Sequence, residues 1–176
     1  RHGLHRMYIL CYEMADNAAR TPRRVPRNCI AALNTHDMPP FAAFWEGTDI
    51  PISSGLGFIK DNEVDAEKES RQATKYALTG FLKNNNYLKT EESNTRSILK
   101  ACLSYLSASE AYTVLLNAED LWQETRAQNI PGAGDRFPSW LRKARYGLEE
   151  FCRWRDINDI LKEMNSLRKR GKREGR

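Results

Sequence analysis

The sequence predicts an α/β fold in which parallel strands are connected through helices. Three short apolar runs rich in strand-forming residues occupy residues 7–12, 29–33 and 112–116. None of them alternates between apolar and polar residues, and continuous runs are typical of strands buried on both faces of a parallel sheet. Helical patterns separate the second run from the third and also follow the third. This order fits an α/β sheet or barrel.

The connection between the first two runs is expected to be irregular. Residues 15–27 contain Pro22 and Pro26 and only a weak apolar stripe, a combination that opposes helix formation. Two amphipathic helices are expected next, over residues 64–84 and 93–106, with Ser93 as the N-cap of the second.

The C-terminal third is expected to be helical in two places. Residues 140–151 show a partial helical pattern, and residues 156–170 show the clearest one in the chain. The apolar face of this last helix consists of Ile157, Ile160, Leu161, Met164 and Leu167. Because this face ends at Leu167, we expect residues 168–176 to form a flexible basic tail.

Length and composition limit the class of protein. The 176 residues, 40% hydrophobic and 10% aromatic, are too apolar for a disordered chain. No run of 18 apolar residues is present, so no membrane span is expected. The first residue is Arg1 and no signal-type stretch follows it. We therefore expect one region, residues 1–176, that is a piece of a longer protein.

The net charge of +5 is concentrated at one end. Residues 168–176 hold six basic residues and one acidic residue, which accounts for the whole excess. The rest of the chain is balanced and lacks the basic face with interleaved aromatics of nucleic-acid readers. Nucleic acid is therefore not an expected partner.

The cysteines and histidines do not form a metal-binding pattern. The four cysteines are far apart and mostly have apolar neighbours, so we expect buried free thiols in a reducing compartment and a cytoplasmic location. His2 and His5 have a metal-like spacing but no third ligand. No metal and no cofactor are expected. The cysteines are Cys11, Cys29, Cys102 and Cys152.

The polar segment after the second run is the first candidate site. Strand-forming residues stop near Leu33, and two prolines then begin a short helix that Gly47 closes. His36 and Asp37 therefore fall between the end of a strand and a helix, where catalytic side chains lie in α/β folds. Asp37 could instead cap this helix, and His36 could be structural. The aromatic residues of the helix, Phe41, Phe44 and Trp45, are more often packing residues than sugar platforms.

A second segment has the same character. The third run leads into the polar residues 117–120, and a Gly- and Pro-containing loop follows over residues 128–140. Two strand ends with polar side chains predict that both lie at the same edge of a sheet, where a polar ligand would bind.

Together these segments resemble a known family. Residues 34–37 (Asn-Thr-His-Asp), the helix that contains Trp45, residues 129–132 (Asn-Ile-Pro-Gly) and Trp140 resemble the C-terminal part of amylomaltases, the 4-α-glucanotransferases of glycoside hydrolase family 77. Residues 3–10 also resemble the strand before the His-Asp motif. The resemblance extends from about Gly3 to Trp140 and fades in the final helices.

The resemblance implies the C-terminal portion of a (β/α)8 TIM barrel, with strands six to eight and their helices. It implies that Asp37 is the carboxylate that stabilises the transition state, and that His36 and Asn129 bind substrate. The nucleophilic aspartate and the acid/base glutamate would lie upstream of Arg1, in the missing N-terminal part of the same barrel. Glu13 would lie on the strand directly before that of Asp37, one strand too late to be the acid/base residue.

The implied function is 4-α-glucanotransferase activity on malto-oligosaccharides or starch-like glucans by a retaining double displacement. The isolated region would be inactive. Alternatives are another α-glucan-active enzyme of the α-amylase clan, or a non-catalytic glucan- or protein-binding domain. The chain departs from the family's more usual residues at three positions. It has Ala133 where Pro-Gly-Thr is more usual, Ser139 where Asn-Trp is more usual, and Met38 where many relatives have a polar residue after His-Asp. These departures bear on donor and acceptor preference.

Overall fold

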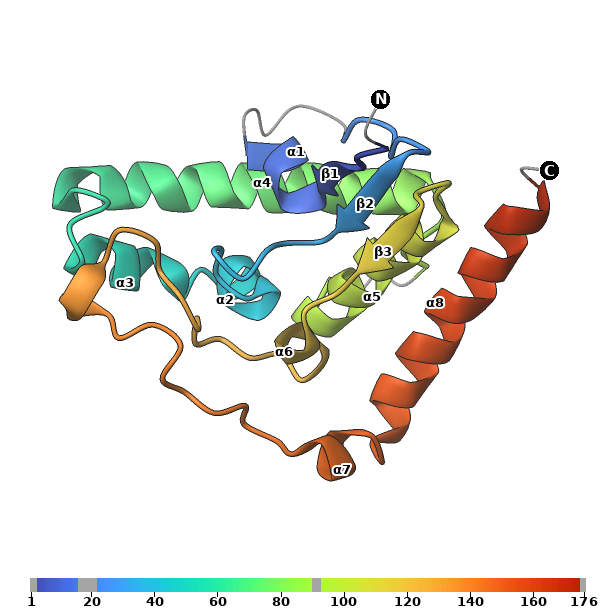
Figure 1. The fold of residues 1–176 in the computed structure, drawn as a ribbon. Helices are drawn as coiled ribbons and strands as arrows, with labels where there is room; N and C mark the ends of the chain where they lie inside the picture. The colour runs from blue at the N-terminus through green and yellow to red at the C-terminus, as the bar shows by residue number, and fades with distance from the viewer. Residues whose placement is uncertain (1–2, 16–21, 90–92, 175–176) are drawn as a thin grey trace.

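A three-stranded parallel sheet lies at the centre of the protein (Figure 1), in a computed structural model that describes residues 3–15, 22–89 and 93–174. The strands β1 (Arg6–Ile9), β2 (Cys29–Ala32) and β3 (Thr113–Leu115) are ordered β1-β2-β3, and both pairings are parallel. The α/β class and the three predicted strands are confirmed.

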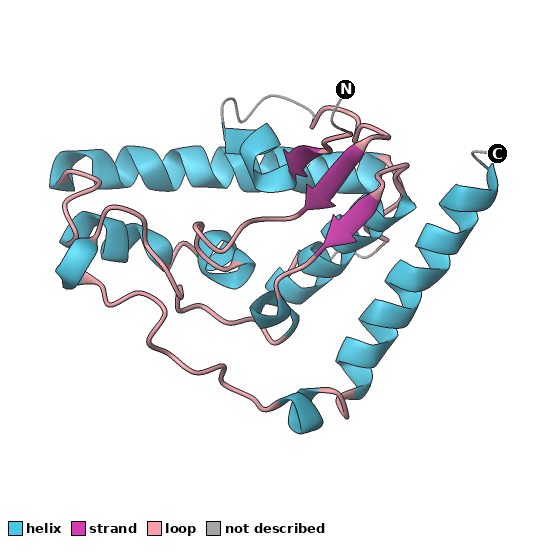
Figure 2. Cartoon of the chain, in the orientation of Figure 1, coloured by secondary structure: helices cyan, strands magenta, loops and turns pink. Residues whose placement is uncertain are grey.

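Helices connect the strands and lie behind and beside the sheet (Figure 2). They are α1 (Leu10–Ala15), α2 (Phe41–Glu46), α3 (Asp49–Gly55), α4 (Val64–Asn84), α5 (Thr95–Ala108), α6 (Ala118–Leu121), α7 (Leu148–Phe151) and α8 (Arg155–Glu174), with short 3-10 helices η1 (Asp61–Glu63) and η2 (Gly134–Arg136).

Three local expectations need correction. The first strand ends at Ile9, which pairs with Ala32 at the end of β2, and α1 begins at Leu10. The N-cap of α5 is Asn94 rather than Ser93, since the Asn94 side chain accepts a hydrogen bond from the backbone N–H of Ser97. Most of the partly helical stretch expected over residues 140–151 is loop, and α7 forms only its last turn.

The connection between β1 and β2 is irregular where it is described. Residues 22–28 contain no helix or strand, as expected, while residues 16–21 lie outside the described part of the chain. The Arg24 and Arg27 guanidinium groups both bond the Glu110 carboxylate, at 3.1 and 2.7 Å. These ion pairs attach the connection to the segment that leads into β3.

The core lies between one face of the sheet and the helices behind it in Figure 1. Tyr8, Ala31 and Val114 are neighbours in register on this face; Tyr8 and Ala31 are buried in the core, and Val114 is partly buried against it. Leu78 of α4 and Leu103 of α5, each 1% exposed, pack in the same core. Burying side chains of this size stabilises a fold by about 1.5–3 kcal/mol each.

The opposite face of the sheet is also apolar but remains more open. Met7 is 56% exposed and Leu115 is 49% exposed, although both are on strands that form the sheet. In Figure 2 no described helix crosses in front of β2 and β3. Ile9 and Ala32 on the same face are 6% and 4% exposed, so the described residues cover this apolar face only in part.

The last helix is longer and better anchored than expected. Ile157, Ile160 and Met164 of α8 are buried in the core cluster, and α8 lies against α5. The helix continues to Glu174, and the Arg168 guanidinium donates to the carbonyl oxygens of Ser109, Ala111 and Tyr112 at 2.8, 2.5 and 3.2 Å. The expectation that packing ends at Leu167 is wrong, because Arg168 is anchored to these three carbonyls of a segment about 57 residues earlier in the chain, which the sequence does not reveal.

The cysteines are free thiols, but they are not all buried. Cys11, Cys29 and Cys102 are buried, whereas Cys152 at the end of α7 is exposed. Burial raises the pKa of the Cys11 thiol to about 12. Within the described residues, no helix combines the length and apolar character needed to cross a membrane.

Candidate functional site

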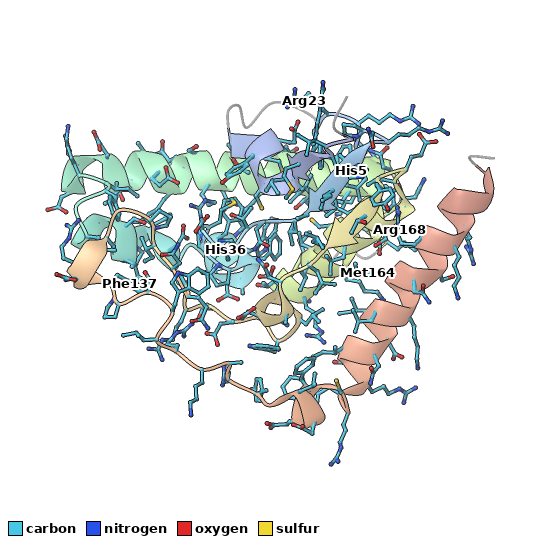
Figure 3. All side chains as sticks on the ribbon, in the orientation of Figure 1. His5, Arg23, His36, Phe137, Met164 and Arg168 are labelled. Atoms are coloured by element: carbon cyan, nitrogen blue, oxygen red, sulfur yellow. The ribbon has the colours of Figure 1, made fainter. Side chains whose placement is uncertain are left out.

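Two loops meet beyond the carboxyl ends of the parallel strands. One leaves β2 and carries His36 and Asp37 to the start of α2, and the other leaves β3 and leads to α6. Figure 3 places His36 beyond the ends of the strands, beside α2. Ligands of parallel α/β proteins bind at this edge of the sheet.

The three predicted site residues lie together. Asn129 Nδ2 donates a hydrogen bond of 2.6 Å to Asp37 Oδ1, and His36 Nε2 is 3.4 Å from the same oxygen. The backbone N–H of Asp37 donates to Thr35 Oγ1 at 3.3 Å. The side chains of Asp37 and His36 remain 47% and 63% exposed. Asp37 is therefore held by neighbours while its carboxylate stays open to a ligand.

Asp37 does not cap the helix that follows it. The N-cap of α2 is Pro40, which has no capping side chain, and the backbone N–H of Phe41 donates instead to Asp120 Oδ1 at 2.7 Å. The end of α2 agrees with the sequence analysis, since Gly47 closes it in the left-handed conformation at φ 77°. The role of capping α2, which the sequence analysis considered for Asp37, thus belongs to Asp120, a residue that the sequence analysis did not single out.

Asp120 is buried, with 3% of its surface exposed. Desolvation raises its pKa from 3.8 to about 6, against the opposing effects of the Phe41 N–H and of the Asn34 side chain, while Glu119 raises it further. The Asn34 amide lies beside the carboxylate, although its Nδ2 falls outside the geometry of a full hydrogen bond. Asn34 Oδ1 accepts from Asn117 Nδ2 at 2.8 Å, which links the ends of β2 and β3.

A hollow of about 180 Å³ opens beside this cluster, lined by His36, Asn117, Asp120, Gln128 and Trp140 among others. The Trp140 ring is 58% exposed and its centroid is 5.3 Å from that of His36, with the ring planes at 59°. Its backbone has φ 63°, a conformation that is costly for a non-glycine residue. The backbone N–H of Trp140 donates to the Gln128 carbonyl at 2.9 Å, which fixes the backbone of this part of the loop beside the hollow.

The loop that carries Asn129 is anchored against the region after α3. Arg136 donates to the Leu56 carbonyl, and its guanidinium lies 5.7 Å from the centre of the Phe58 ring. Gly132 has φ 83°, and a Cβ there would lie 3.6 Å from the same ring. A side chain at this position would therefore be strained by its backbone conformation.

The aromatic residues of α2 are structural, as expected. Phe41 and Trp45 are buried, with ring centroids 5.8 Å apart, and the Arg71 guanidinium lies 4.0 Å from the centre of the Phe44 ring. Arg71 also bonds Asp49 of α3. These contacts position α2 and leave its aromatic rings no open face at the hollow described above.

Glu13 belongs to α1 rather than to a strand. Arg23 Nε and Nη2 donate to its two carboxylate oxygens, each at 2.7 Å. These hydrogen bonds lower the pKa of Glu13, which would not suit a proton donor at neutral pH.

The histidine pair at the N-terminus has no metal-like surroundings in the part that is described. His5 stacks on Tyr112 with ring centroids 4.3 Å apart, and His2 lies outside the described residues. The described residues contain no group of three or more His, Cys, Asp or Glu side chains that could hold a metal ion.

Comparison with known proteins assigns this chain to a glycoside hydrolase family. The sequence pattern of glycoside hydrolase family 77, described as 4-alpha-glucanotransferase, matches residues 1–149. The chain belongs to this family, as the resemblance of its motifs predicted.

Individual relatives agree. A 4-alpha-glucanotransferase of Haemophilus influenzae is 26% identical over 125 residues, covering 67% of this chain and 18% of the relative. One of Mycobacterium tuberculosis is 29% identical over 113 residues, covering 64% and 16%. The crystal structure of amylomaltase from Corynebacterium glutamicum superposes with a TM-score of 0.63 at 24% identity, covering 76% of this chain and 21% of that one. The chain thus spans less than a fifth of these curated relatives, and the superposition supports the α/β fold.

Proposed function

We propose that this chain is part of a 4-α-glucanotransferase that transfers α-1,4-glucan segments between malto-oligosaccharides by a retaining double displacement. The observation that carries the proposal is the cluster of Asp37, His36 and Asn129 beyond the carboxyl ends of parallel strands, in a chain that belongs to this family. Proteins of this fold class place their catalytic side chains at the same edge.

The proposal includes the architecture of the complete protein. Residues 1–176 would form one region that contributes strands six to eight of a (β/α)8 barrel, with β1, β2 and β3 in those places. Two observations support this assignment. The sheet has a partly open apolar face, which a barrel interior would bury, and β1 and β3 each have an outer edge to which a neighbouring strand could pair.

Asp37 would act by stabilising charge in the transition state. Glycosyl transfer with retention requires a nucleophilic carboxylate and a carboxylic acid that protonates the leaving oxygen. In the complete protein these would come from strands outside this chain. Positive charge develops on the sugar ring as the bond breaks, and a fixed carboxylate gains most at that moment. The Asn129 and His36 contacts would keep the Asp37 carboxylate in place and present further polar atoms to the sugar hydroxyls.

Trp140 would supply the apolar contact that a glucosyl ring needs. Its exposed indole borders the same hollow as His36, and aromatic faces bury apolar surface without needing a hydrogen-bond partner there. Such a surface beside a cluster of polar groups is the usual composition of a small-ligand site.

The reaction needs carboxylates and sugars only, so the proposed mechanism uses no cofactor. A cytoplasmic location remains a prediction.

The experiment is to replace Asp37 with Asn in the complete protein that contains this chain, and to follow glucose release and longer products from maltotriose. Asn keeps the size of the side chain and an oxygen that can accept from Asn129. Losing one preorganised transition-state contact costs a factor of about 10²–10³ in kcat, or roughly 3–4 kcal/mol. We expect kcat to fall by that factor while KM changes little.

Asp65→Asn is the matched control, because the Asp65 side chain, in the first turn of α4, is 89% exposed and pairs with Lys68. Unchanged turnover in the Asp37→Asn protein would remove the main support for the proposal. Shorter products without longer ones in the unsubstituted protein would indicate a hydrolase of the same clan. Binding of maltotriose without any turnover would indicate a non-catalytic glucan-binding protein.

A further inference from the structure

The loop that carries the proposed catalytic carboxylate depends on few contacts of its own. Residues 35–40 connect Asn34, just beyond β2, with Phe41, the first residue of α2. Within the loop, Asp37 N–H donates to Thr35 Oγ1 and Met38 N–H donates to the Thr35 carbonyl at 3.1 Å. These bonds shape one turn, but they do not fix the loop relative to the sheet.

One buried carboxylate lies at both ends of this loop. Asp120 Oδ1 accepts the backbone N–H of Phe41 at the end of the loop, and the Asn34 amide lies beside the same carboxylate at its start. Asn34 is itself 4% exposed and accepts from Asn117. Asp120 is 79 residues from Phe41 along the chain. The contact therefore ties the loop after β2 to the segment after β3.

The choice of an acid at this buried position is costly. Among the described residues no cation pairs with Asp120, and desolvation and the neighbouring Glu119 both disfavour its charged form. A neutral side chain such as Ser or Asn can also cap a helix. Both neighbours of the carboxylate are N–H donors, however: the Phe41 N–H is hydrogen-bonded to it, and the Asn34 amide lies beside it without a full hydrogen bond. An ionised carboxylate presents acceptors toward both, while an amide presents one acceptor and one donor. The ionised acid suits this double contact.

We propose that Asp120 is a positioning residue, which holds both ends of the loop over residues 35–40 and thereby sets the place of the Asp37 carboxylate relative to the sugar. This inference rests on the proposed function. Asp120 acts through Asp37 and through the start of α2, not by contact with the reacting atoms. A displacement of about 1 Å in a reacting group can cost a factor of about 10² in rate, so a small movement of the loop is sufficient.

The test is a double-mutant cycle in the complete protein, with kcat and KM measured for maltotriose. We expect Asp120→Asn to lower kcat by about 10- to 100-fold with KM changed little. We expect the Asp37→Asn, Asp120→Asn protein to be no slower than Asp37→Asn, because the second change acts only through the first position. An unchanged kcat in Asp120→Asn, or losses that multiply in the double variant, would overturn the inference.

Two further variants separate positioning from folding. Ile160→Ala makes a cavity where α8 packs on α5, away from the loop, and is expected to lower the melting temperature while kcat of the folded protein is unchanged. Asn34→Ala removes one loop-end contact and leaves the Asp120 contact to Phe41 intact. If Asp120→Asn does not fold, Asn34→Ala must lower kcat, and it must do so non-additively with Asp37→Asn; otherwise the inference fails. Absence of transfer by the unsubstituted protein would overturn both this inference and the proposed function, whereas transfer that survives the Asp120 and Asn34 changes would overturn the inference only.

Discussion

Burial of the Asp120 carboxyl predicts how the free energy of unfolding changes with pH, which can be tested without an activity assay. Its pKa in the folded protein is about 6, against an ordinary value of 3.8. Between these values the folded state holds a proton that the unfolded state has released. Because the folded state binds more protons in this window, the free energy of unfolding falls as the pH rises through it. The contribution of Asp120 is present below the window and lost above it.

The magnitude follows from the size of the pKa change. One pKa unit corresponds to about 1.36 kcal/mol, so the full loss is about 3 kcal/mol, and roughly 2 kcal/mol of it falls between about pH 4.5 and pH 7.5. Other carboxyl groups also titrate there, and some act in the opposite direction. Arg23 lowers the pKa of Glu13, so the contribution of Glu13 to the free energy of unfolding increases as the pH rises. The informative quantity is therefore the difference between two proteins.

The assay is urea unfolding of the complete protein and of its Asp120→Asn variant over this range. Asn does not titrate, so the stability of the variant relative to the parent should increase by roughly 2 kcal/mol from about pH 4.5 to about pH 7.5. The variant is expected to gain stability at neutral pH and still lose activity, because Asn keeps one oxygen for the Phe41 N–H but presents an NH2 group in place of the second carboxylate oxygen beside the Asn34 amide. Stability profiles that run parallel for the two proteins would refute this account of Asp120.

Three other predictions follow from contacts outside the loop. Arg168→Ala removes the donor to three backbone carbonyls and should lower the free energy of unfolding by about 1–3 kcal/mol. Lys169→Ala is the control, and equal stabilities of the two variants would contradict the docking of α8. Thiol titration should count four cysteines in the denatured, non-reduced chain but one fast-reacting thiol, Cys152, in the folded chain; a denatured count of two or fewer would indicate disulfides. Trp140→Ala should raise KM for maltotriose by about 10-fold, since an exposed aromatic contact is lost, and Trp140→Phe should raise it less. Equal KM values in the unsubstituted protein and both variants would exclude a sugar contact.

Local signals in the sequence predicted the elements that depend on near neighbours. The helix over residues 64–84 has the predicted bounds, because its apolar spacing and its polar ends lie within the segment itself. The short helix after Pro39 and Pro40 ends at Gly47 as predicted, since proline and glycine restrict the backbone at their own positions. His36 and Asp37 were found in the same way, as polar residues that follow a buried strand, whereas Asn129 was named from the resemblance to the family.

Tertiary structure decided the contacts that join distant parts of the chain. The sequence left open whether Asp37 caps α2, and the structure gives that contact to Asp120, 79 residues beyond Phe41. Asn129 reaches Asp37 across 92 residues. The anchoring of Arg168 depends on three carbonyls before β3 that no spacing within α8 reveals. Spacing along a chain predicts which face of an element is apolar, but the partner of a polar group depends on where the whole chain places it.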